Sequence, residues 1–197
     1  MARPVAGRRT PAAALPAWIR PQLTQLVEAA PDGPEWLHEI KFDGYRLHAR
    51  LDRGTVRLLT RTGLDWTHKY PPIATAVASL GALQAYLDGE LCGVFPDGIT
   101  SFGMTQTASD PGNAAGLVYF IFDLLYLDDQ DLCPRPLIER KARLAALLSG
   151  VAPPLHYSDY HRGRAQPSMS KLANWSSKAS SRNAPTQRTR PATAVYG

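Results

Sequence analysis

The sequence has little of what would direct a protein out of the cell or into a membrane. Its 197 residues include only two cysteines, Cys92 and Cys133, too few for a disulfide framework or a cysteine-rich metal cluster. No stretch approaches the about 20 apolar residues that span a bilayer, and the basic N-terminus has no apolar signal core. The five histidines show no spacing typical of metal ligands. We therefore expect a cytosolic protein with reduced thiols and no membrane partner.

Acidic side chains are missing from both ends of the chain. Residues 1–20 hold four arginines and residues 160–197 hold seven Lys or Arg, and neither segment contains Asp or Glu. Residues 21–159 contain 11 basic and 17 acidic side chains, so the formal charge of +5 arises at the ends. A basic surface over the whole body is thereby excluded, and any contact with DNA would need a local patch.

Composition divides the chain into three segments. Residues 1–16 are rich in Pro, Ala and Arg, which predicts a disordered N-terminal arm. Residues 17–162 carry the apolar periodicity of one globular domain. Residues 163–197 have almost no Leu, Ile, Val or Phe and are rich in Ser, Ala, Thr, Pro and Arg. We expect this last segment to be a basic, disordered tail.

Hairpins interleaved with helices predict an α+β fold built on antiparallel sheets. The expected strands are residues 36–41, 45–51, 55–60, 85–94, 117–127 and 155–160. The expected helices are residues 17–30, 72–83, 101–107 and 136–148, and the expected turns include residues 43–44, 52–54 and 96–98.

The most informative stretch is residues 39–46, because it holds a lysine beside a turn and among charged side chains. Lys41 ends an extended run, with Glu39 on the same face of the expected strand and Arg46 nearby. Asp43-Gly44 is expected to reverse the chain into the next strand. A lysine held between two strands could bind a phosphate or attack one as an amine. An ordinary hairpin with a surface lysine is the alternative that this stretch alone leaves open.

Lys-x-Asp-Gly-x-Arg in this stretch resembles motif I of the nucleotidyltransferase superfamily. Four further stretches follow in the order found in that superfamily, so five in all are residues 36–46, 58–66, 87–91, 119–127 and 136–141. Together they resemble the adenylation domain of bacterial ATP-dependent DNA ligases, and most closely the ligase module of end-joining ligase D. The resemblance implies an ATP-grasp-like adenylation domain of antiparallel sheets with flanking helices.

The resemblance also implies an activity. Lys41 would attack the α-phosphate of ATP and form a lysyl–AMP; AMP would pass to the 5′-phosphate of a DNA nick, and the 3′-hydroxyl would displace it. ATP and Mg²⁺ are the implied cofactors. Nicked or broken double-stranded DNA and end-joining repair proteins are the implied partners, in the bacterial cytoplasm and at the nucleoid. Only a neutral amine attacks, so Mg²⁺ or Arg46, with partial burial, would have to favour that form.

The resemblance assigns five further residues to the nucleotide site. Glu90 resembles an acid that binds ribose or metal, with a solvated strand acid as the alternative. Phe122 resembles an aromatic that stacks on adenine, with a plain core residue as the alternative. Arg61 resembles an arginine near the nucleotide and DNA phosphates, with a surface charge as the alternative. Asp43 is interpreted as a turn and positioning residue, and Glu39 as meeting the adenine edge by side chain or backbone.

The sequence departs from the family after about residue 165. The family continues with motif IV (an acid before Gly-Ile-Val-x-Lys), motif V with phosphate-binding lysines, and an OB-fold domain, and this sequence contains none of them. Back-translated in the adjacent frame, residues 171–197 permit Glu-Phe-Glu-Gly-Ile-Val-Ser-Lys, so we interpret the tail as a frameshift product; a divergent natural tail is the alternative. We therefore expect an adenylation domain that is incomplete on its C-terminal side and does not join nicks.

Two further functions remain open on these residues. One is an RNA ligase or a capping-type nucleotidyltransferase, against which the matches around Trp66 and Phe122 favour a DNA ligase. The other is an inert, nucleotide-binding remnant.

Overall fold

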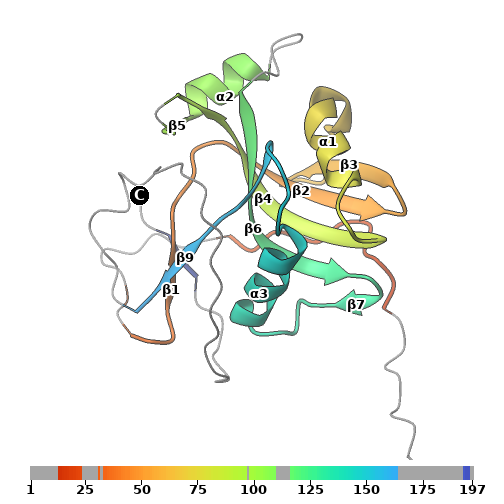
Figure 1. Cartoon of the computed structure of the whole chain (residues 1–197), viewed down its shortest axis with the longest axis vertical. Helices are drawn as coiled ribbons and strands as arrows, with labels where there is room; N and C mark the ends of the chain where they lie inside the picture. Colours follow the sequence, from red (N-terminus) through yellow and green to blue (C-terminus); the bar gives the residue numbers. More distant parts are fainter. Residues whose placement is uncertain are drawn as a thin grey trace, which may run out of the picture.

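A computed structural model describes residues 13–23, 31, 33–96, 98–109 and 116–163, together with the backbone of residues 193–195. It contains one seven-stranded sheet and one three-stranded sheet, with helices on the outside (Figure 1). Within the described residues, no helix combines the length and apolar character needed to cross a membrane.

The large sheet has the strand order β3-β2-β4-β6-β7 and is antiparallel along this path. Its strands are β2 (Tyr45–Asp52), β3 (Thr55–Thr60), β4 (Gln84–Val94), β6 (Leu117–Leu127) and β7 (Gln130–Asp131). Strand β5 (Thr100–Ser101) pairs with β4, and β8 (Leu155–Tyr157) pairs with β6 in parallel. The small sheet has the order β10-β1-β9, with bounds Thr193–Val195, Leu37–Glu39 and Tyr160–Arg162.

The helices are short and, apart from α2, lie on one side of the large sheet. They are η1 (Thr67–Lys69), α1 (Pro71–Ala78), α2 (Phe102–Ala108) and α3 (Leu137–Leu147). Ile73 and Val77 of α1 and Leu144 of α3 join one apolar cluster with Leu87 and Tyr119 of the sheet. Because successive strand residues point to opposite faces, this core uses every second residue of β2 and β4 and leaves the other residues for the opposite face.

The opposite face of the large sheet carries charged side chains. On β2 these are Arg46, His48 and Arg50, and on β4 they are Asp88 and Glu90. Strand register places Arg46 directly beside Glu90, and His48 beside Asp88. Burying charges on a sheet face is costly unless each finds a partner, so the partners on this face decide what it can do.

Strand β6 contains two bulges where it runs along this face. Its register with β4 shifts between Tyr86 and Leu87 and again between Asp88 and Gly89. Phe122 is the extra residue at the second shift, because Asp88 is paired with Asp123 and Gly89 with Ile121. Bulges change the direction of side chains, and they are frequent next to functional sites.

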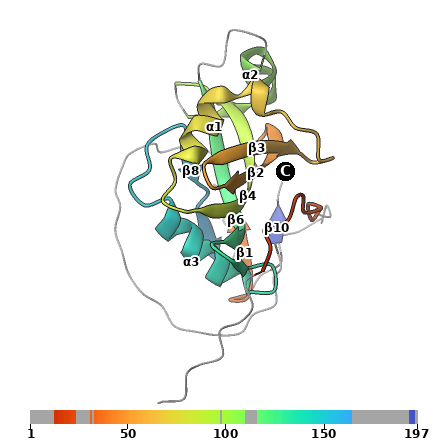
Figure 2. The same cartoon turned by 90° about the vertical axis from the view of Figure 1, so that its right-hand side faces the viewer.

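Residues 13–23 form an irregular strap across the same face, on the side of the sheet away from α1 and α3 (Figure 2). It is tied to side chains of three neighbouring strands. The contacts are Tyr126 Oη to Ala13 O (2.5 Å), Arg50 Nε to Pro16 O (2.9 Å), Ile19 N to Tyr86 Oη (3.0 Å) and Arg46 Nη1 to Gln22 O (2.8 Å). The strap therefore covers much of the charged face and provides acceptors for its arginines.

Most of the expected elements are confirmed. The structure has the α+β class, and β3 and β6 have the expected bounds. Residues 52–54 turn the chain with Arg53 and Gly54 at positive φ, and Ser101 caps α2 by accepting from Met104 N. Helix α1 ends earlier than expected, at Ala78. Residues 17–23 of the first expected helix are irregular, and residues 24–30 lie outside the described part.

The expected central hairpin is wrong. Strands β1 and β2 belong to different sheets: β1 pairs with β9 and β10, whereas β2 pairs with β3 and β4. Lys41 consequently lies in the connection between two sheets, and Glu39 ends β1, so the two residues do not share a strand face. The expected strand at residues 155–160 is likewise divided into β8 and β9, one in each sheet.

The structure describes short segments within the expected N-terminal arm and within the expected tail. Residues 13–16 of the expected arm are held by the strap contacts, and residues 1–12 lie outside the description. In the expected tail, residues 193–195 form β10 parallel to β1, although we expected no regular structure there. β10 pairs with the side of β1 that β9 leaves open, so β1 is the central strand of the small sheet. Residues 164–192 and 196–197 lie outside the description.

Candidate active site

Lys41 is exposed on the connection between β1 and β2, and its neighbours are fixed to the large sheet. The Phe42 ring stacks on Phe120 of β6, with 4.1 Å between centroids and 12° between planes. The Asp43 carboxylate accepts a hydrogen bond of 3.3 Å from Phe102 N at the start of α2. Among the described residues, the Lys41 amine has no hydrogen bond or ion pair. The loop is therefore anchored next to the lysine while the amine itself stays available.

Gly44 is required by a close approach to β4. A Cβ at this position would lie 2.1 Å from Leu91 O and 2.7 Å from Cys92 Sγ. Its φ lies outside the left-handed region, so the turn itself does not demand glycine here. The glycine of Lys-x-Asp-Gly thus allows the loop to lie against β4, where the Gly44 N–H acts to lower the pKa of Glu90.

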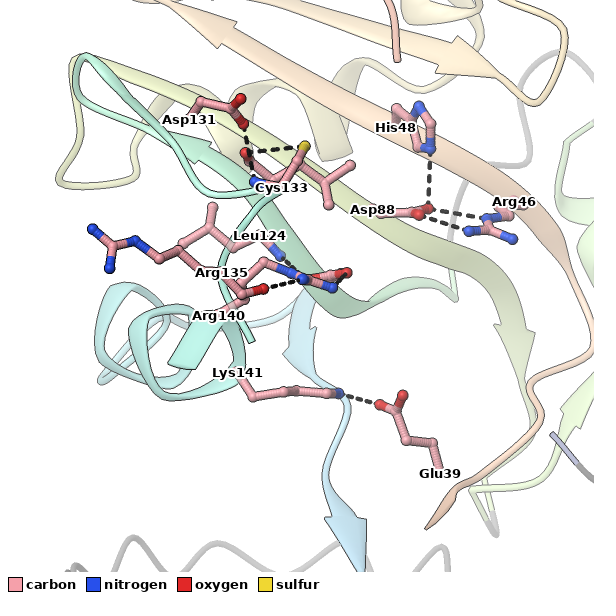
Figure 3. Close-up of polar contacts among 12 residues, drawn as sticks. Glu39, Arg46, His48, Asp88, Leu124, Asp131, Cys133, Arg135, Arg140 and Lys141 are labelled. Atoms are coloured by element: carbon pink, nitrogen blue, oxygen red, sulfur yellow. Dashed lines mark hydrogen bonds and ion pairs between the residues drawn. The ribbon is translucent and has the colours of Figure 1, made fainter. Parts of the chain in front are cut away.

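Arg46 and Asp88 form a bidentate ion pair on the charged face (Figure 3). Arg46 Nε and Nη2 donate to the two Asp88 oxygens at 3.1 Å and 2.7 Å. Burial alone would raise the pKa of Asp88, but hydrogen bonds from His48 and Arg46 outweigh it and lower that pKa. Asp88 therefore stays ionised and fixes the plane of the Arg46 guanidinium.

His48 continues this network into the sheet. Its Nε2 lies 3.2 Å from Asp88 Oδ1, and its Nδ1 lies 3.0 Å from Tyr86 Oη. Burial raises the pKa of Tyr86 to about 12, so the phenol keeps its proton. Because the phenol keeps its proton and accepts from Ile19 N, it donates to His48 Nδ1. The strap reaches the same network through Ile19 N.

Glu90 lies beside Arg46, half-buried, near the open end of this face. Burial raises the pKa of Glu90 to about 7, although Arg46 and the Gly44 N–H both act to lower it. At neutral pH the carboxyl is therefore divided between its two forms. Any cation placed against it would favour the ionised form.

The described residues contain no group of three or more His, Cys, Asp or Glu that could hold a metal ion. Mg²⁺ is commonly bound by only one or two carboxylates together with substrate phosphates. Glu90 fits this mode of binding and does not fit a dedicated metal cage.

Phe122 is half-buried, and the Arg46 guanidinium carbon lies 5.4 Å from the centre of its ring. The ring is therefore packed against a cation at a bulge rather than buried in the apolar core. Phe120, two residues earlier, is already covered by Phe42. Of the two aromatic residues on this part of β6, Phe122 is the less enclosed.

Arg61 is exposed one residue after the end of β3, in the turn closed by Gly63 at positive φ. Within the described residues it contacts no other predicted site residue. The structure thus brings Lys41, Asp43, Arg46, Glu90 and Phe122 to one end of the charged face and leaves Arg61 on its rim.

Glu39 is held by a fully buried lysine (Figure 3). Lys141 of α3 is 0% exposed, and its Nζ donates to Glu39 Oε1 and, at 3.0 Å, to Ser158 O. The Ser158 hydroxyl also reaches Glu39 Oε1, at 3.4 Å. Burial raises the pKa of Glu39, and Lys141 opposes this effect. This pair joins the small sheet to the helical layer of the large one.

A second ion pair lies next to it on α3. Arg140 Nε and Nη2 both donate at 2.8 Å to the two oxygens of Asp123, and Arg140 Nη1 donates to Arg135 O. Asp123 follows Phe122 at the bulge of β6. Arg140 thereby fixes the backbone next to Phe122.

Sequence reasoning missed three polar residues of this site: Asp88, His48 and Lys141. A signal existed for each of them. Alternation along β4 puts Asp88 on the face of Glu90, and Lys141 occupies the same helical stripe as the inward-facing Leu137 and Leu144. Alternation along β2 likewise puts His48 on the face of Arg46, but its partner Asp88 could be assigned only once the pairing of β2 with β4 was known.

A comparison with protein families identifies the chain. The family model described as "ATP dependent DNA ligase domain" matches residues 21–184. The chain belongs to this family. The matched range extends into the segment from residue 163 onward, for which composition predicts a basic, disordered tail.

Individual ligases agree with this assignment. The multifunctional non-homologous end joining protein LigD of Pseudomonas aeruginosa is 46% identical over 144 residues, which are 73% of this chain and 17% of that protein. A DNA ligase of Pyrobaculum calidifontis is 32% identical over 144 residues, which are 66% of this chain and 25% of that ligase. The chain thus spans only a small part of these relatives' length.

Two solved structures have the same fold. The ligase domain of LigD from M. tuberculosis superposes with a TM-score of 0.53 at 32% identity, covering 64% of this chain and 39% of that one. A mycobacterial DNA ligase D complexed with ATP and MES gives a TM-score of 0.54 at 32% identity, covering 64% of this chain and 40% of that one. These neighbours support a ligase adenylation fold for the described body.

Proposed function

We propose that this ligase-domain chain transfers AMP from ATP to Lys41, the first step of DNA ligation. The observation that carries the proposal is the anchoring of the Lys41 loop. Phe42, Asp43 and Gly44 are each fixed to the sheet or to α2, whereas the amine between them and β1 is free among the described residues. Such a loop presents a nucleophile in one place without consuming it.

In this step the lone pair of Lys41 Nζ attacks the α-phosphorus of ATP. A phosphorus–nitrogen bond forms, the bond from the α-phosphorus to the bridging oxygen breaks, and pyrophosphate leaves with the bond electrons. The amine loses a proton to solvent. Arg46, oriented by Asp88, stabilises negative charge at the sugar and phosphate end of the nucleotide.

The remaining site residues hold the nucleoside and the metal. Phe122 offers an aromatic surface for adenine, and Glu39 is the acceptor for the amino group of the base. Glu90 holds the ribose or Mg²⁺, and the metal would offset charge on the phosphates. Asp43 positions the loop through Phe102 N, and Arg61 on the rim contacts phosphates of the nucleotide or of DNA.

We propose that the substrate of the later steps is nicked or broken double-stranded DNA; a relative named as an end joining protein supports this proposal. We propose a role in bacterial DNA repair and recombination in the cytoplasm, at the nucleoid. The similarity to ligase D, rather than any feature of surface charge, supports this assignment, because the body of the chain is acidic overall.

The test is incubation of the chain with α-labelled ATP and Mg²⁺, followed by peptide mapping. We expect acid-labile label on Lys41 alone, lost in Lys41→Ala and retained in the control Lys69→Ala, an exposed lysine that packs on Trp66. Label on Lys69 or Lys141 would contradict the assignment. Labelling from α-labelled GTP in preference to ATP would favour a capping-type enzyme, and binding without any label would favour an inert remnant.

Joining of a nicked duplex separates the first step from sealing. We expect the 197-residue chain to fail in this assay, because its sequence contains neither motif IV nor motif V. Efficient joining by the purified chain would show that these motifs are dispensable or replaced.

A further inference from the structure

Among the described charged side chains that the proposed chemistry does not use, Lys141 is the one most completely removed from solvent. It is 0% exposed, and its three donors face Glu39, Ser158 and the rings of Tyr157 and Tyr160 at 5.3 and 5.7 Å. Burying an ammonium group costs several kcal/mol, so a buried lysine that only filled space would be replaced at a gain by an apolar residue. The position of its partner suggests what the lysine is for.

The partner, Glu39, uses only one of its two oxygens. Lys141 and Ser158 both contact Oε1, and among the described residues no hydrogen bond reaches Oε2. The Glu39 side chain is 10% exposed and lies two residues before Lys41. Oε2 is not a fully buried atom, so this oxygen is open to solvent and can accept a hydrogen bond from an incoming donor.

We propose that Lys141 determines which base the site accepts. By pairing with Glu39 Oε1, Lys141 keeps the carboxylate ionised, so that it can only accept hydrogen bonds. Its second oxygen then accepts from the 6-amino group of adenine and repels a purine that has a carbonyl at that position. The inference rests on the proposed nucleotide site. It assigns a role to a residue of α3 that does not itself touch the nucleotide.

The electrostatics around Glu39 support this role. Burial raises the pKa of Glu39, Lys141 lowers it through charge and hydrogen bond, Asp123 raises it, and Ser158 lowers it. Tyr157 and Tyr160 also face this carboxylate, and burial raises the pKa of both phenols, so they remain neutral. Of the described groups around Glu39, Lys141 is the one that lowers its pKa most.

Without Lys141 the Glu39 carboxyl would hold its proton to higher pH. A protonated carboxyl is a donor as well as an acceptor. It can then donate to the 6-carbonyl of hypoxanthine, and the preference for adenine is lost.

The experiment compares ATP with ITP, which differs from ATP at the 6-position of the base and carries the same sugar and phosphates. Two readouts are used on the 197-residue chain with Mg²⁺: covalent label from the α-labelled nucleotides, and the shift in Tm caused by each nucleotide. We expect wild type to prefer ATP roughly tenfold to hundredfold, the ratio that one charge-assisted hydrogen bond supports.

We expect Lys141→Met to bring this ratio to within about threefold, and to accept ITP better as the pH falls from 8.5 to 6. Lys141→Arg, which keeps the charge, should retain most of the preference. Lys69→Met is the control and should leave the ratio unchanged. A merely structural role would lower the use of both nucleotides together and leave their ratio intact, and that result would overturn the inference.

Lys141→Met leaves Glu39 unpaired and could prevent folding. The double variant Glu39→Gln/Lys141→Met has no charge at either position and keeps the shape of the pair, so it decides the question in that case. An amide both donates and accepts, and the double variant should use ATP and ITP alike; retained preference for ATP overturns the inference. If the nucleotides shift the Tm but no label appears on Lys41, the proposed function is refuted, while the Tm shifts still measure base selectivity. If the wild-type chain binds neither nucleotide, both the proposed function and the role of Lys141 are overturned.

Discussion

The bidentate pair between Arg46 and Asp88 should be worth far more to stability than the chemically identical pair between Arg57 and Asp65. Side-chain exposures are 23% and 6% in the first pair, against 50% and 38% in the second. Replacing Arg46 by Met keeps most of the side-chain volume and removes two donors from a carboxylate that is almost fully buried. Removing one partner of such a pair costs about 3–5 kcal/mol.

Replacing Arg57 by Met removes one exposed bond of 2.9 Å and should cost less than about 1 kcal/mol. A domain of this size has a free energy of unfolding of about 5–15 kcal/mol, so the loss expected for Arg46→Met is a large fraction of the total. Urea unfolding followed by tryptophan fluorescence measures both variants, provided that the m-values agree. Equal losses in the two variants would refute the reasoning from burial.

The pH dependence of the Arg46→Met effect gives a second check. Hydrogen bonds from His48 and Arg46 lower the pKa of Asp88 in the folded protein despite its burial. The contribution of the ionised carboxylate is therefore present above the pKa of the unfolded chain, about 4, and is lost as the pH falls through the lower folded value. We expect the difference between wild type and Arg46→Met to be constant from pH 5 to 7 and to shrink below about pH 4. A difference that grew in acid would contradict the assignment of an ionised Asp88.

Three further outcomes follow from the site. Gly44→Ala should cost about 1–3 kcal/mol in urea unfolding, because its Cβ would lie 2.1 Å from Leu91 O; Gly81→Ala, where a Cβ meets nothing within 4 Å, should cost nothing. Glu90→Gln should stabilise the chain by about 2 kcal/mol at pH 8 and leave its stability unchanged at pH 4. The pKa of Glu90 is about 7 in the folded protein and 4.5 in the unfolded chain. Ionisation of Glu90 therefore lowers the stability of the folded state as the pH rises from about 4.5 to 7. Equal effects at both pH values would show that charge is not the cause. Removing residues 1–23 should lower the free energy of unfolding by about 2–4 kcal/mol, since four hydrogen bonds to β2, β4 and β6 are lost. Removing residues 1–12 alone should leave these four hydrogen bonds in place. Equal Tm values for the two truncated chains would contradict the role given to the strap.

The elements that could be predicted are those whose signals are local. The strand at residues 117–127, the turn at residues 52–54 and the helix expected from residue 101 each depend on neighbours within a few residues, and the structure confirms all three. The central hairpin failed because Asp43-Gly44 looks like a turn locally, whereas the glycine is there for contact with Leu91 of another strand. A pattern cannot distinguish a glycine needed for a turn from one needed for a close approach.

The candidate site divides in the same way. Lys41, Arg46, Glu90 and Phe122 were expected from motif residues, and the fold gathers them at one end of a sheet face. The residues that orient them were missed because their partners are far along the chain: Asp88 is 42 residues from Arg46, and Lys141 is 102 residues from Glu39. Charged residues at such positions are ordinarily solvated, so only the three-dimensional pairing shows that these are buried.

The strap also constrains the order in which the chain can assemble during synthesis. Its partners are separated from it by 24, 34, 67 and 113 residues, and the last of them, Tyr126, belongs to β6. At about 5–20 residues per second, a ribosome needs roughly 6–23 s to make the 113 residues from Ala13 to Tyr126. The strap is translated before its partners, and its Ala13 end is therefore anchored only after β6 has been made. During that interval the arginines of β2 are left to water, and a nascent chain stalled before β6 should expose residues 13–23 to proteases that the finished domain resists.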